Sequence, residues 1–264
     1  MTSISPRLPR PRLLHAVLAA GAMAMAMPAD APRAVAADTT SFTPAQRQEI
    51  VGIMRDALKN DPTILSDAIA ALRSSANAAQ QNAARSALES HRSDLLTPNA
   101  SDAILGTVTA RTTVVEFYDP RCPYCRKVLP DLDRLTHEDH DLRIIEKVIP
   151  VLGQGSLITS QALVAAFIQG GQDAYFRMQR AIMSDSTAPT VERMRALATQ
   201  SGLNATTLAT DMNGPKVTAI LQANMDLARA IGLDGTPTFV FNARQIIPGA
   251  VDYDDLKKAI AQNR

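Results

Sequence analysis

The stretch that decides the fold is "FYDPRCPYCRKVLP", Phe117 to Pro130, and it contains both cysteines of the 264-residue chain. They stand as Cys122-Pro123-Tyr124-Cys125, after an apolar run and at the start of an amphipathic one. Two thiols at this spacing can ligate a metal, close a small disulfide ring or exchange electrons with other proteins. The flanking sequence decides among these three chemistries.

The segments on either side of the cysteines predict a βαβ unit. "TTVVEFYD", Thr112 to Asp119, is β-branched and apolar with a single internal charge, which predicts a buried central strand. A helix is expected from about Cys122 to His137, and "LRIIEKVIP", Leu142 to Pro150, predicts the next strand. A C-x-x-C at the strand-to-helix turn of such a unit is typical of a thioredoxin-like redox site.

The expected position of Cys122 favours a reactive thiolate. At the N-terminus of a helix, free backbone N–H groups and the positive end of the helix dipole stabilise an anion. The thiolate is the attacking form in disulfide exchange and the better leaving group. Cys125, one turn further on, is placed to attack a mixed disulfide at Cys122, and Pro123 fixes the first helical turn.

Glu116 is the one charge inside the predicted central strand. A buried carboxylate is costly and needs a reason. One interpretation is a proton acceptor for the thiol of Cys125, because a perturbed carboxylate beside a nucleophile is a common arrangement. The other is a glutamate at the end of the strand that points to solvent. We favour the first.

Metal and structural-disulfide interpretations of the cysteine pair have less support. Structural zinc takes four Cys or His ligands, and the chain has only His15, His91, His137 and His140, the first of them in the predicted leader. No built-in metal site is therefore expected, although two thiolates could hold Cu(I). A disulfide within the pair closes a very short loop, which restrains the unfolded chain little.

The rest of the chain predicts an inserted helical block and a second half of the sheet. Residues 156–232 follow a helical pattern throughout and are expected to form four or five helices. "TPTFVFN" and "RQIIPGA" predict two strands joined through Asn242-Ala243 in a tight hairpin, and "DYDDLKKAIAQN" predicts a closing helix. Without the block a four-stranded sheet remains, with Ala103 to Gly106 as a candidate edge strand.

The first residues have the order of a secretory signal. Three arginines precede the apolar run Leu13 to Met27, and small residues follow. We expect residues 1–36 to be a signal peptide, cleaved after Ala36 or Ala37. The alternative is an uncleaved amphipathic anchor. An exported protein can keep a disulfide.

Residues 37–97 are expected to form a helical N-terminal extension. Thr43 followed by Pro44 and Gln46 predicts a helix start with a capping box. The next helix carries an a/d stripe over about three heptads, at Leu65, Ile69, Leu72, Ala76, Ala79 and Ala83. The stripe either packs on the rest of the chain or pairs with copies of itself, and its length favours a homo-oligomer, either a dimer or a trimer.

The composition is that of a globular protein and argues against some partners. Lys+Arg number 27 and Asp+Glu 26, a net charge of +1, which gives no support to a nucleic-acid partner. Tryptophan is absent and aromatic residues make up 4%, so a stacking platform for bases is not expected.

Residues 98–264 resemble the DsbA-like branch of the thioredoxin superfamily. The resemblance rests on "VVEFYDPRCPYCRKVLP", "EKVIPVLG", the helical insertion at about 156–232 and "GTPTFVFN". It implies an α/β thioredoxin fold with an inserted helical domain, and an enzyme that exchanges thiols and disulfides without a cofactor. By this likeness Cys122 is the nucleophile, Cys125 the resolving thiol and Glu116 the buried acid.

The same likeness implies how client proteins are bound. Pro237 is then a cis-proline, and the backbone of Thr236 pairs with an extended client chain, beside Pro123 and Tyr124 of the redox turn. A membrane thiol–disulfide redox partner is implied for an exported member.

Two departures from the oxidase DsbA favour isomerisation or reduction of disulfides. The dipeptide between the cysteines is Pro-Tyr where the oxidase has Pro-His, so the thiolate of Cys122 has one donor fewer and the site is expected to be less oxidising. Thr236 stands where the oxidase has valine, as is common in isomerases and reductases. A helical extension before a DsbA-like domain is also similar to ScsC and related oligomeric isomerases.

The sequence thus predicts a periplasmic disulfide isomerase that acts on misfolded or disulfide-bonded client proteins. Three alternatives stay open: a DsbA-type dithiol oxidase, a Cu(I)-binding carrier in copper tolerance, and a scaffold whose cysteine pair is structural.

Overall fold

The computed structural model describes residues 42–264, so the predicted signal peptide lies outside the described residues. The described residues divide into two compact units, one that ends at Pro62 and one from Thr63 to Arg264. The first contains helix α1 (Pro44–Asn60), which begins with the expected capping box between Thr43 and Gln46. None of the helices within residues 42–264 is both long and apolar enough to cross a membrane.

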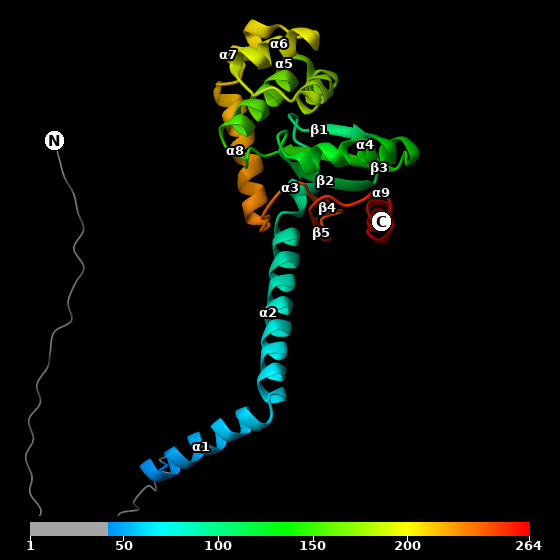
Figure 1. Cartoon of the computed structure of the whole chain (residues 1–264). Helices are drawn as coiled ribbons and strands as arrows, with labels where there is room; N and C mark the ends of the chain where they lie inside the picture. Colours follow the sequence, from blue (N-terminus) through cyan, green and yellow to red (C-terminus); the bar gives the residue numbers. More distant parts are fainter. Residues whose placement is uncertain (1–41) are drawn as a thin grey trace, which may run out of the picture. The chain divides into compact units, whose positions relative to one another are not determined.

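The second unit is built on a five-stranded sheet in the order β1-β3-β2-β4-β5 (Figure 1). The strands are β1 (Ala103–Gly106), β2 (Thr112–Tyr118), β3 (Leu142–Val148), β4 (Thr238–Phe241) and β5 (Gln245–Pro248). Strand β2 runs parallel to β3 and antiparallel to β4, and the other pairs are antiparallel. The candidate edge strand at Ala103 to Gly106 is confirmed, because β1 pairs with β3 along its whole length. The sheet therefore has one strand more than the expected four.

Helices cover both faces of this sheet. On one face, α4 (Pro123–Glu138) and α9 (Tyr253–Gln262) pack on the strands through a cluster that includes Val114 of β2. On the other face, the next residue, Val115, packs with Leu88, Leu95 and Ala228, from α2 (Thr63–Ser90), α3 (Arg92–Leu96) and α8 (Pro215–Ala230). Successive side chains of a strand point to opposite faces, so β2 is buried on both, as its apolar sequence predicts.

The helical block lies between β3 and β4 in the chain, as expected. It consists of α5 (Gln154–Ser184), α6 (Val191–Gln200), α7 (Ala205–Asp211) and α8. Helix α5 is broken at Gly170 and Gly171, which have non-helical backbone angles; Gly171 has a φ of 67°, a conformation that side-chain-bearing residues rarely adopt. The core of the block also contains both cysteines.

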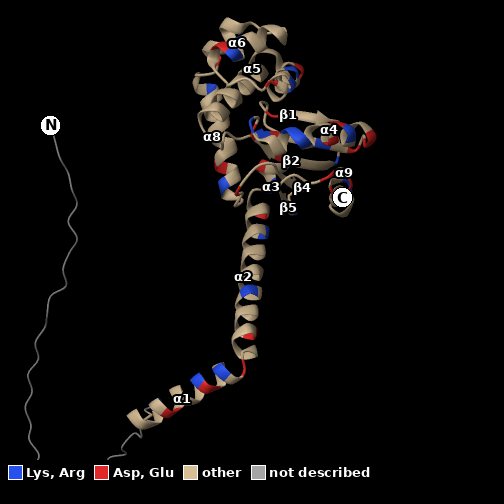
Figure 2. Ribbon diagram, in the orientation of Figure 1, with Lys and Arg blue, Asp and Glu red and all other residues tan. Residues whose placement is uncertain are grey.

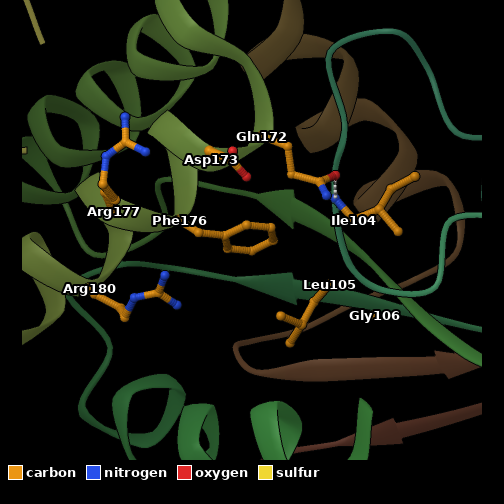
Figure 3. Close-up of a pocket in the computed structure, with 8 residues that line it drawn as sticks. All are labelled: Ile104, Leu105, Gly106, Gln172, Asp173, Phe176, Arg177 and Arg180. Carbon is orange, nitrogen blue, oxygen red and sulfur yellow. Dashed lines mark hydrogen bonds between the residues drawn. The ribbon is translucent and has the colours of Figure 1, made fainter. Parts of the chain in front are cut away.

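Helix α5 is fastened to the edge of the sheet by a side chain. The backbone N–H of Ile104 in β1 donates to Oε1 of Gln172 at 3.0 Å, which satisfies an amide that the sheet leaves unpaired (Figure 3). A cavity of about 320 Å³ lies beside this contact and is lined by residues such as Phe176 and Arg180. Further along α5, Tyr175 and Gln179 reach the centre of the sheet, as described below.

The predicted hairpin and the closing helix are both present. Asn242, Ala243 and Arg244 join β4 to β5. Asn242 and Ala243 have positive φ values of 44° and 50°, as the two central residues of a tight hairpin turn require, and the Arg244 N–H closes that turn on the Phe241 oxygen at 2.9 Å. Oδ1 of Asn242 accepts from the Thr113 N–H at 2.8 Å, which ties the turn back to β2. Asp252 caps α9 through its side chain.

Helix α2 has two different parts. Its predicted stripe is solvent-exposed in the single chain, with Leu65 at 55%, Ile69 at 40% and Leu72 at 71% exposure. Leu88, near its C-terminal end, is the only buried residue of the helix and belongs to the core of the second unit. Figure 2 shows how few charged side chains α2 carries. Within the second unit, the large residues of the stripe therefore do not pack on the rest of the chain.

Candidate active site

Cys122 lies in the turn between the end of β2 and the start of α4. It is the N-cap residue of α4, with φ −70° and ψ 121°, and Pro123 takes the first helical position. The first backbone N–H groups of a helix have no intrahelical acceptor and carry partial positive charge, which favours an anion at this position. Cys122 therefore occupies the position at the start of the helix that the sequence predicts, and the reactivity of its thiolate there stays a prediction.

The turn before β4 meets this sulfur. Sγ of Cys122 donates to the backbone oxygen of Thr236 at 3.3 Å. The Thr236–Pro237 peptide bond is cis, as the resemblance implied, and is the one cis bond among the described residues. Residues that are 114 positions apart in sequence are thus brought together at the redox turn. Their contact with client proteins stays a prediction.

The two thiols lie in different surroundings. Both are free and buried in this structure, with 4% of Cys122 and 1% of Cys125 exposed. Burial raises the pKa of the Cys125 thiol far above its usual range, and the carboxyl of Glu116 raises it further. Cys125 therefore needs a base to lose its proton near neutral pH.

Glu116 is buried behind the cysteines. It is 2% exposed, so the interpretation as a glutamate pointing to solvent is wrong. Burial raises the pKa of its carboxyl well above the ordinary range, and the neighbouring Glu146 and Cys122 add to the shift. A carboxyl in this position can hold or receive a proton close to Cys125, and its function as the acceptor stays a prediction.

Asp119 was not singled out by the sequence analysis, yet it holds the redox turn together. Its side chain is fully buried. One carboxylate oxygen accepts from the Arg121 N–H at 2.8 Å, and the other accepts from the N–H groups of Val151 and Leu152 at 2.9 and 3.1 Å. Hydrogen bonds to a charged acceptor are the strong ones. Asp119 thereby joins the turn before Cys122 to the loop after β3.

These two segments present apolar side chains to solvent. Tyr124 is 61% exposed, Val151 41% and Leu152 55%. The carboxylate of Asp119 fixes the backbone of the two loop residues, so their apolar side chains are held out of the core. Exposed apolar groups at a reactive centre are a surface on which an unfolded chain can dock.

A cation also lies beside Cys122. Arg126, one turn later on α4, donates through Nε to the Pro120 oxygen at 3.3 Å, and its Nη2 is buried without a hydrogen-bond partner. Burial lowers the pKa of the Arg126 guanidinium, and the charges of Asp185, Asp119 and Cys122 oppose that shift. The side chain is thus close enough to act electrostatically on the thiolate.

A second buried carboxyl, Glu146, was also missed. It stands opposite Glu116 in the parallel register of β2 and β3 and is 3% exposed. The signal was available, because Glu146 interrupts the apolar run of its strand just as Glu116 interrupts the first. Lys147, the next residue in β3, forms a buried ion pair with Asp102. Both carboxylate oxygens of Asp102 accept from Nζ of Lys147, at 2.7 and 2.8 Å. Among residues 42–264, no lysine, arginine or histidine forms an ion pair with Glu146.

Within residues 42–264 there is no group of three or more His, Cys, Asp or Glu side chains that could hold a metal ion. Any metal at the redox turn would therefore rest on the two thiolates alone.

Two family models match this chain. One, described as a DSBA-like thioredoxin domain, matches residues 113–261, which is more than half of the chain. The other, described as the copper resistance protein ScsC N-terminal domain, matches residues 46–79, within α1 and α2. The resemblance inferred from the residues is thereby confirmed.

Solved structures agree with these matches. ScsC of Proteus mirabilis in a transitional conformation is 28% identical, covers 84% of this chain and 97% of its own, and superposes with a TM-score of 0.60. A thioredoxin-like oxidoreductase from Silicibacter pomeroyi is 33% identical, with 65% and 96% of the two chains covered and a TM-score of 0.60.

Curated relatives match over part of their lengths. A protein named as a protein-disulfide oxidoreductase in Rickettsia conorii is 25% identical over 174 residues, and the chain spans 59% of it. The Na+/H+ antiporter NhaA of Herminiimonas arsenicoxydans is 29% identical over 150 residues, and the chain spans 23% of it.

The buried carboxylate of Asp119 yields a first prediction. In Asp119→Asn the charge is lost and one of the two acceptor oxygens becomes an NH2 group, which cannot accept a hydrogen bond, so the protein should lose about 1–3 kcal/mol of unfolding free energy. Amide hydrogen exchange at Arg121, Val151 and Leu152 should accelerate in the folded protein. The exposed Asp173→Asn is the control. Unchanged exchange at the three amides would contradict the assignment.

Proposed function

The chain belongs to the DSBA-like thioredoxin domain family of thiol–disulfide oxidoreductases, and on this premise we propose that it is an exported disulfide isomerase and reductase. Residues 1–36 would be its signal peptide, 37–97 a helical oligomerisation extension and 98–264 the catalytic domain. It would act in the periplasm on proteins with wrong or unwanted disulfides. The observation that carries the proposal is the contact of Cys122 at the start of α4 with the backbone of Thr236.

The reaction begins with the thiolate of Cys122. It attacks one sulfur of a client disulfide, the client S–S bond breaks, and the second client sulfur leaves as a thiolate. A mixed disulfide now joins Cys122 to the client. In isomerisation another client thiolate attacks it, forms a new client disulfide and returns the Cys122 thiolate with no net change of oxidation state.

Reduction resolves the same intermediate with the second cysteine. Cys125 gives its proton to Glu116, attacks the sulfur of Cys122 and releases the client sulfur as a thiolate. The client gains two electrons and the two cysteines form a disulfide. A membrane thiol–disulfide partner would then return the electrons. Because the Cys125 thiol is buried and holds its proton strongly, client thiols have time to compete, which favours isomerisation.

Two features of the redox turn support isomerisation over oxidation. Tyr124 is mostly exposed and uncharged, so it adds no cation to stabilise the reduced form as a histidine there would. The oxygen of Thr236 already contacts Sγ of Cys122, and a client strand placed along that backbone would bring its own disulfide to the same atom. Arg126 acts the other way, which makes the redox potential a decisive measurement.

Single-cysteine variants test this proposal. Reactivation of scrambled ribonuclease by the reduced full-length mature protein should fall to background in Cys122→Ser, because the attacking sulfur is gone. Cys125→Ser should keep part of the isomerase activity and lose insulin reduction, and it should accumulate mixed disulfides with client proteins. Thiol trapping in cells should find the wild-type pair mostly reduced.

An oxidase would behave differently. A pair found mostly oxidised in cells, together with no activity on scrambled ribonuclease, would replace the isomerase by a DsbA-type dithiol oxidase. Alkylation of Cys122 at the rate of an ordinary thiol would support the structural-pair alternative.

The N-terminal helices are proposed to assemble copies of the chain. The a/d stripe of α2 is exposed through Leu65, Ile69 and Leu72, and α1 exposes Ile53 and Met54 as well. Helices with a continuous apolar stripe are stable in water when the stripe is covered. An assembly would place several redox centres around one client.

The stripe gives a prediction about assembly. The wild-type mature chain should be a dimer or trimer in light scattering, and the double variant Leu65→Glu, Leu72→Glu should be a monomer, because charge is costly in a helix seam. Ser74→Glu is the matched control, since Ser74 lies on the opposite side of α2 at about 100° per residue. A wild-type chain that is a monomer in light scattering would contradict the proposed assembly.

A second candidate function is the binding of Cu(I). Two observations favour it: both thiols are free, and the N-terminal helices match the domain described for a copper resistance protein. Soft thiolates suit this ion. An anaerobic titration against a competing Cu(I) chelator should show one ion per chain, lost in Cys122→Ser and in Cys125→Ser but kept in the control His91→Ala. Binding that survives both cysteine variants would exclude the redox turn as the copper site.

A further inference from the structure

We propose that Glu146 is a positioning residue of the redox centre, which shares a proton with Glu116 and so decides when Glu116 can accept the proton of Cys125. The inference rests on the proposed function, since it concerns the step in which Cys125 resolves the mixed disulfide. It extends the site to a second buried carboxyl behind the cysteines.

The register of the sheet carries the argument. Glu116 of β2 and Glu146 of β3 are direct partners in a parallel pair, so their side chains lie on the same face of adjacent strands. The exposed fractions are 2% and 3%. Two carboxylates so close in a buried site cannot both ionise at neutral pH, and such a pair titrates as a unit.

Glu146 is held by a hydrogen-bonded network from the inserted helical block. Nε2 of Gln179 on α5 donates to Oε2 of Glu146 at 2.5 Å and lies 2.9 Å from the hydroxyl of Tyr118. The hydroxyls of Tyr118 and Tyr175 are themselves hydrogen-bonded. The network thus orients the carboxyl group of Glu146 through one of its two oxygens.

The other oxygen of this carboxyl is free. Oε1 of Glu146 and Oε1 of Gln179 are both buried acceptors without a hydrogen-bond partner. Buried polar groups in native proteins nearly always have partners, and exceptions need an explanation. A proton added to the carboxyl pair supplies the donor that this part of the site lacks.

The charges around Glu146 agree with a shared proton. Burial raises the pKa of Glu146 to about 7, while the hydrogen bonds from Gln179 and Tyr118 oppose the shift and Asp133 of α4 adds to it. The pKa of Glu116 is also raised, first by burial and then by the charge of Glu146 itself. Tyr175 faces the same cluster and its hydroxyl keeps its proton, because burial raises its pKa well above the ordinary value.

The cation next to Glu146 in the sequence, Lys147, forms an ion pair with another residue. Lys147 is adjacent to Glu146 in β3, but its ammonium group is bound by both carboxylate oxygens of Asp102. On the side of β1, the residue opposite Glu146 is Ala103, which carries no charge. Among the described neighbours, protonation is therefore the remaining way to neutralise the carboxyl pair.

The chemical consequence concerns one proton. In the resolving step the S–H bond of Cys125 breaks, its proton goes to a carboxylate oxygen of Glu116, and the sulfur attacks Cys122. Glu116 can receive that proton only while its own carboxyl is ionised. When the pair holds a single proton, its residence on Glu146 leaves Glu116 ready to accept.

The experiment follows the two phases of the reaction of the reduced full-length mature protein with dithiobis(nitrobenzoate). The first nitrothiobenzoate is released when Cys122 attacks, and the second when Cys125 resolves the mixed disulfide. Stopped-flow absorbance from about pH 5 to about pH 9 gives a rate profile for each phase. In the wild type, the rate of the second phase should rise with pH through an inflection, because Glu116 must be ionised to accept the proton of Cys125.

Two variants should move this inflection in the same direction by different amounts. Glu146→Gln removes the neighbouring charge, so Glu116 ionises more easily and the inflection should move down by about one pH unit or more. Gln179→Leu removes a donor to the ionised form of Glu146, so Glu146 keeps its proton to higher pH and repels the Glu116 carboxylate less, and the inflection should move down by a smaller amount. The exposed Glu89→Gln should leave both phases unchanged, and the first phase should be unaffected throughout.

Unfolding measurements check that Glu146→Gln folds. A folded pKa raised above the unfolded value gives stability that is complete below the ordinary glutamate pKa and is lost as the pH rises through about 7. Between acid and alkaline pH, the unfolding free energy of Glu146→Gln should therefore fall less than that of the wild type.

The outcomes separate this inference from the proposed function. An unchanged inflection in Glu146→Gln, or an upward shift in either variant, overturns the assignment of Glu146 while the redox function stands. A wild type with no second phase overturns the resolving step itself.

Discussion

Burial of strand β2 is the constraint on which the rest of the structure depends. Its seven residues are all buried, with β3 and β4 on its edges and helices on both faces. The strand therefore fixes the start of α4, the partner of Glu116 and the approach of Thr236 to Cys122. Any charge on β2 must be neutralised or put to use, because water does not reach it.

The site divides the two cysteines by their surroundings rather than by their sequence. Cys122 has the amide end of α4, the backbone of Thr236 and the guanidinium of Arg126 near its sulfur atom. Burial raises the pKa of the Cys125 thiol, and the carboxyl of Glu116 raises it further, so Cys125 keeps its proton. Cys122 is thus suited to attack a client disulfide, and Cys125 is suited to react only afterwards. Disulfide exchange through a mixed disulfide needs these two different functions.

Most of the fold could be predicted from the chain, and part of the site could not. Periodicity identified each strand and the inserted helices, since one- and two-sided burial leave different patterns. The two cysteines and Glu116 stood out as chemistry within those patterns. The function of Asp119 depends on a loop more than thirty residues later, and that of Glu146 on strand register and on a glutamine from another layer. Such contacts are long-range, and no local pattern records them.

The insertion of the helical block has a consequence for how the protein comes to be folded. Strand β4 must pair with β2 after the whole block has been made, and Thr236 reaches Cys122 across 114 residues. Contacts of such sequence separation form late. A newly synthesised chain would thus expose its thiols before the turn at Thr236 covers them, and oxidants and metal ions would have access to both cysteines during that interval.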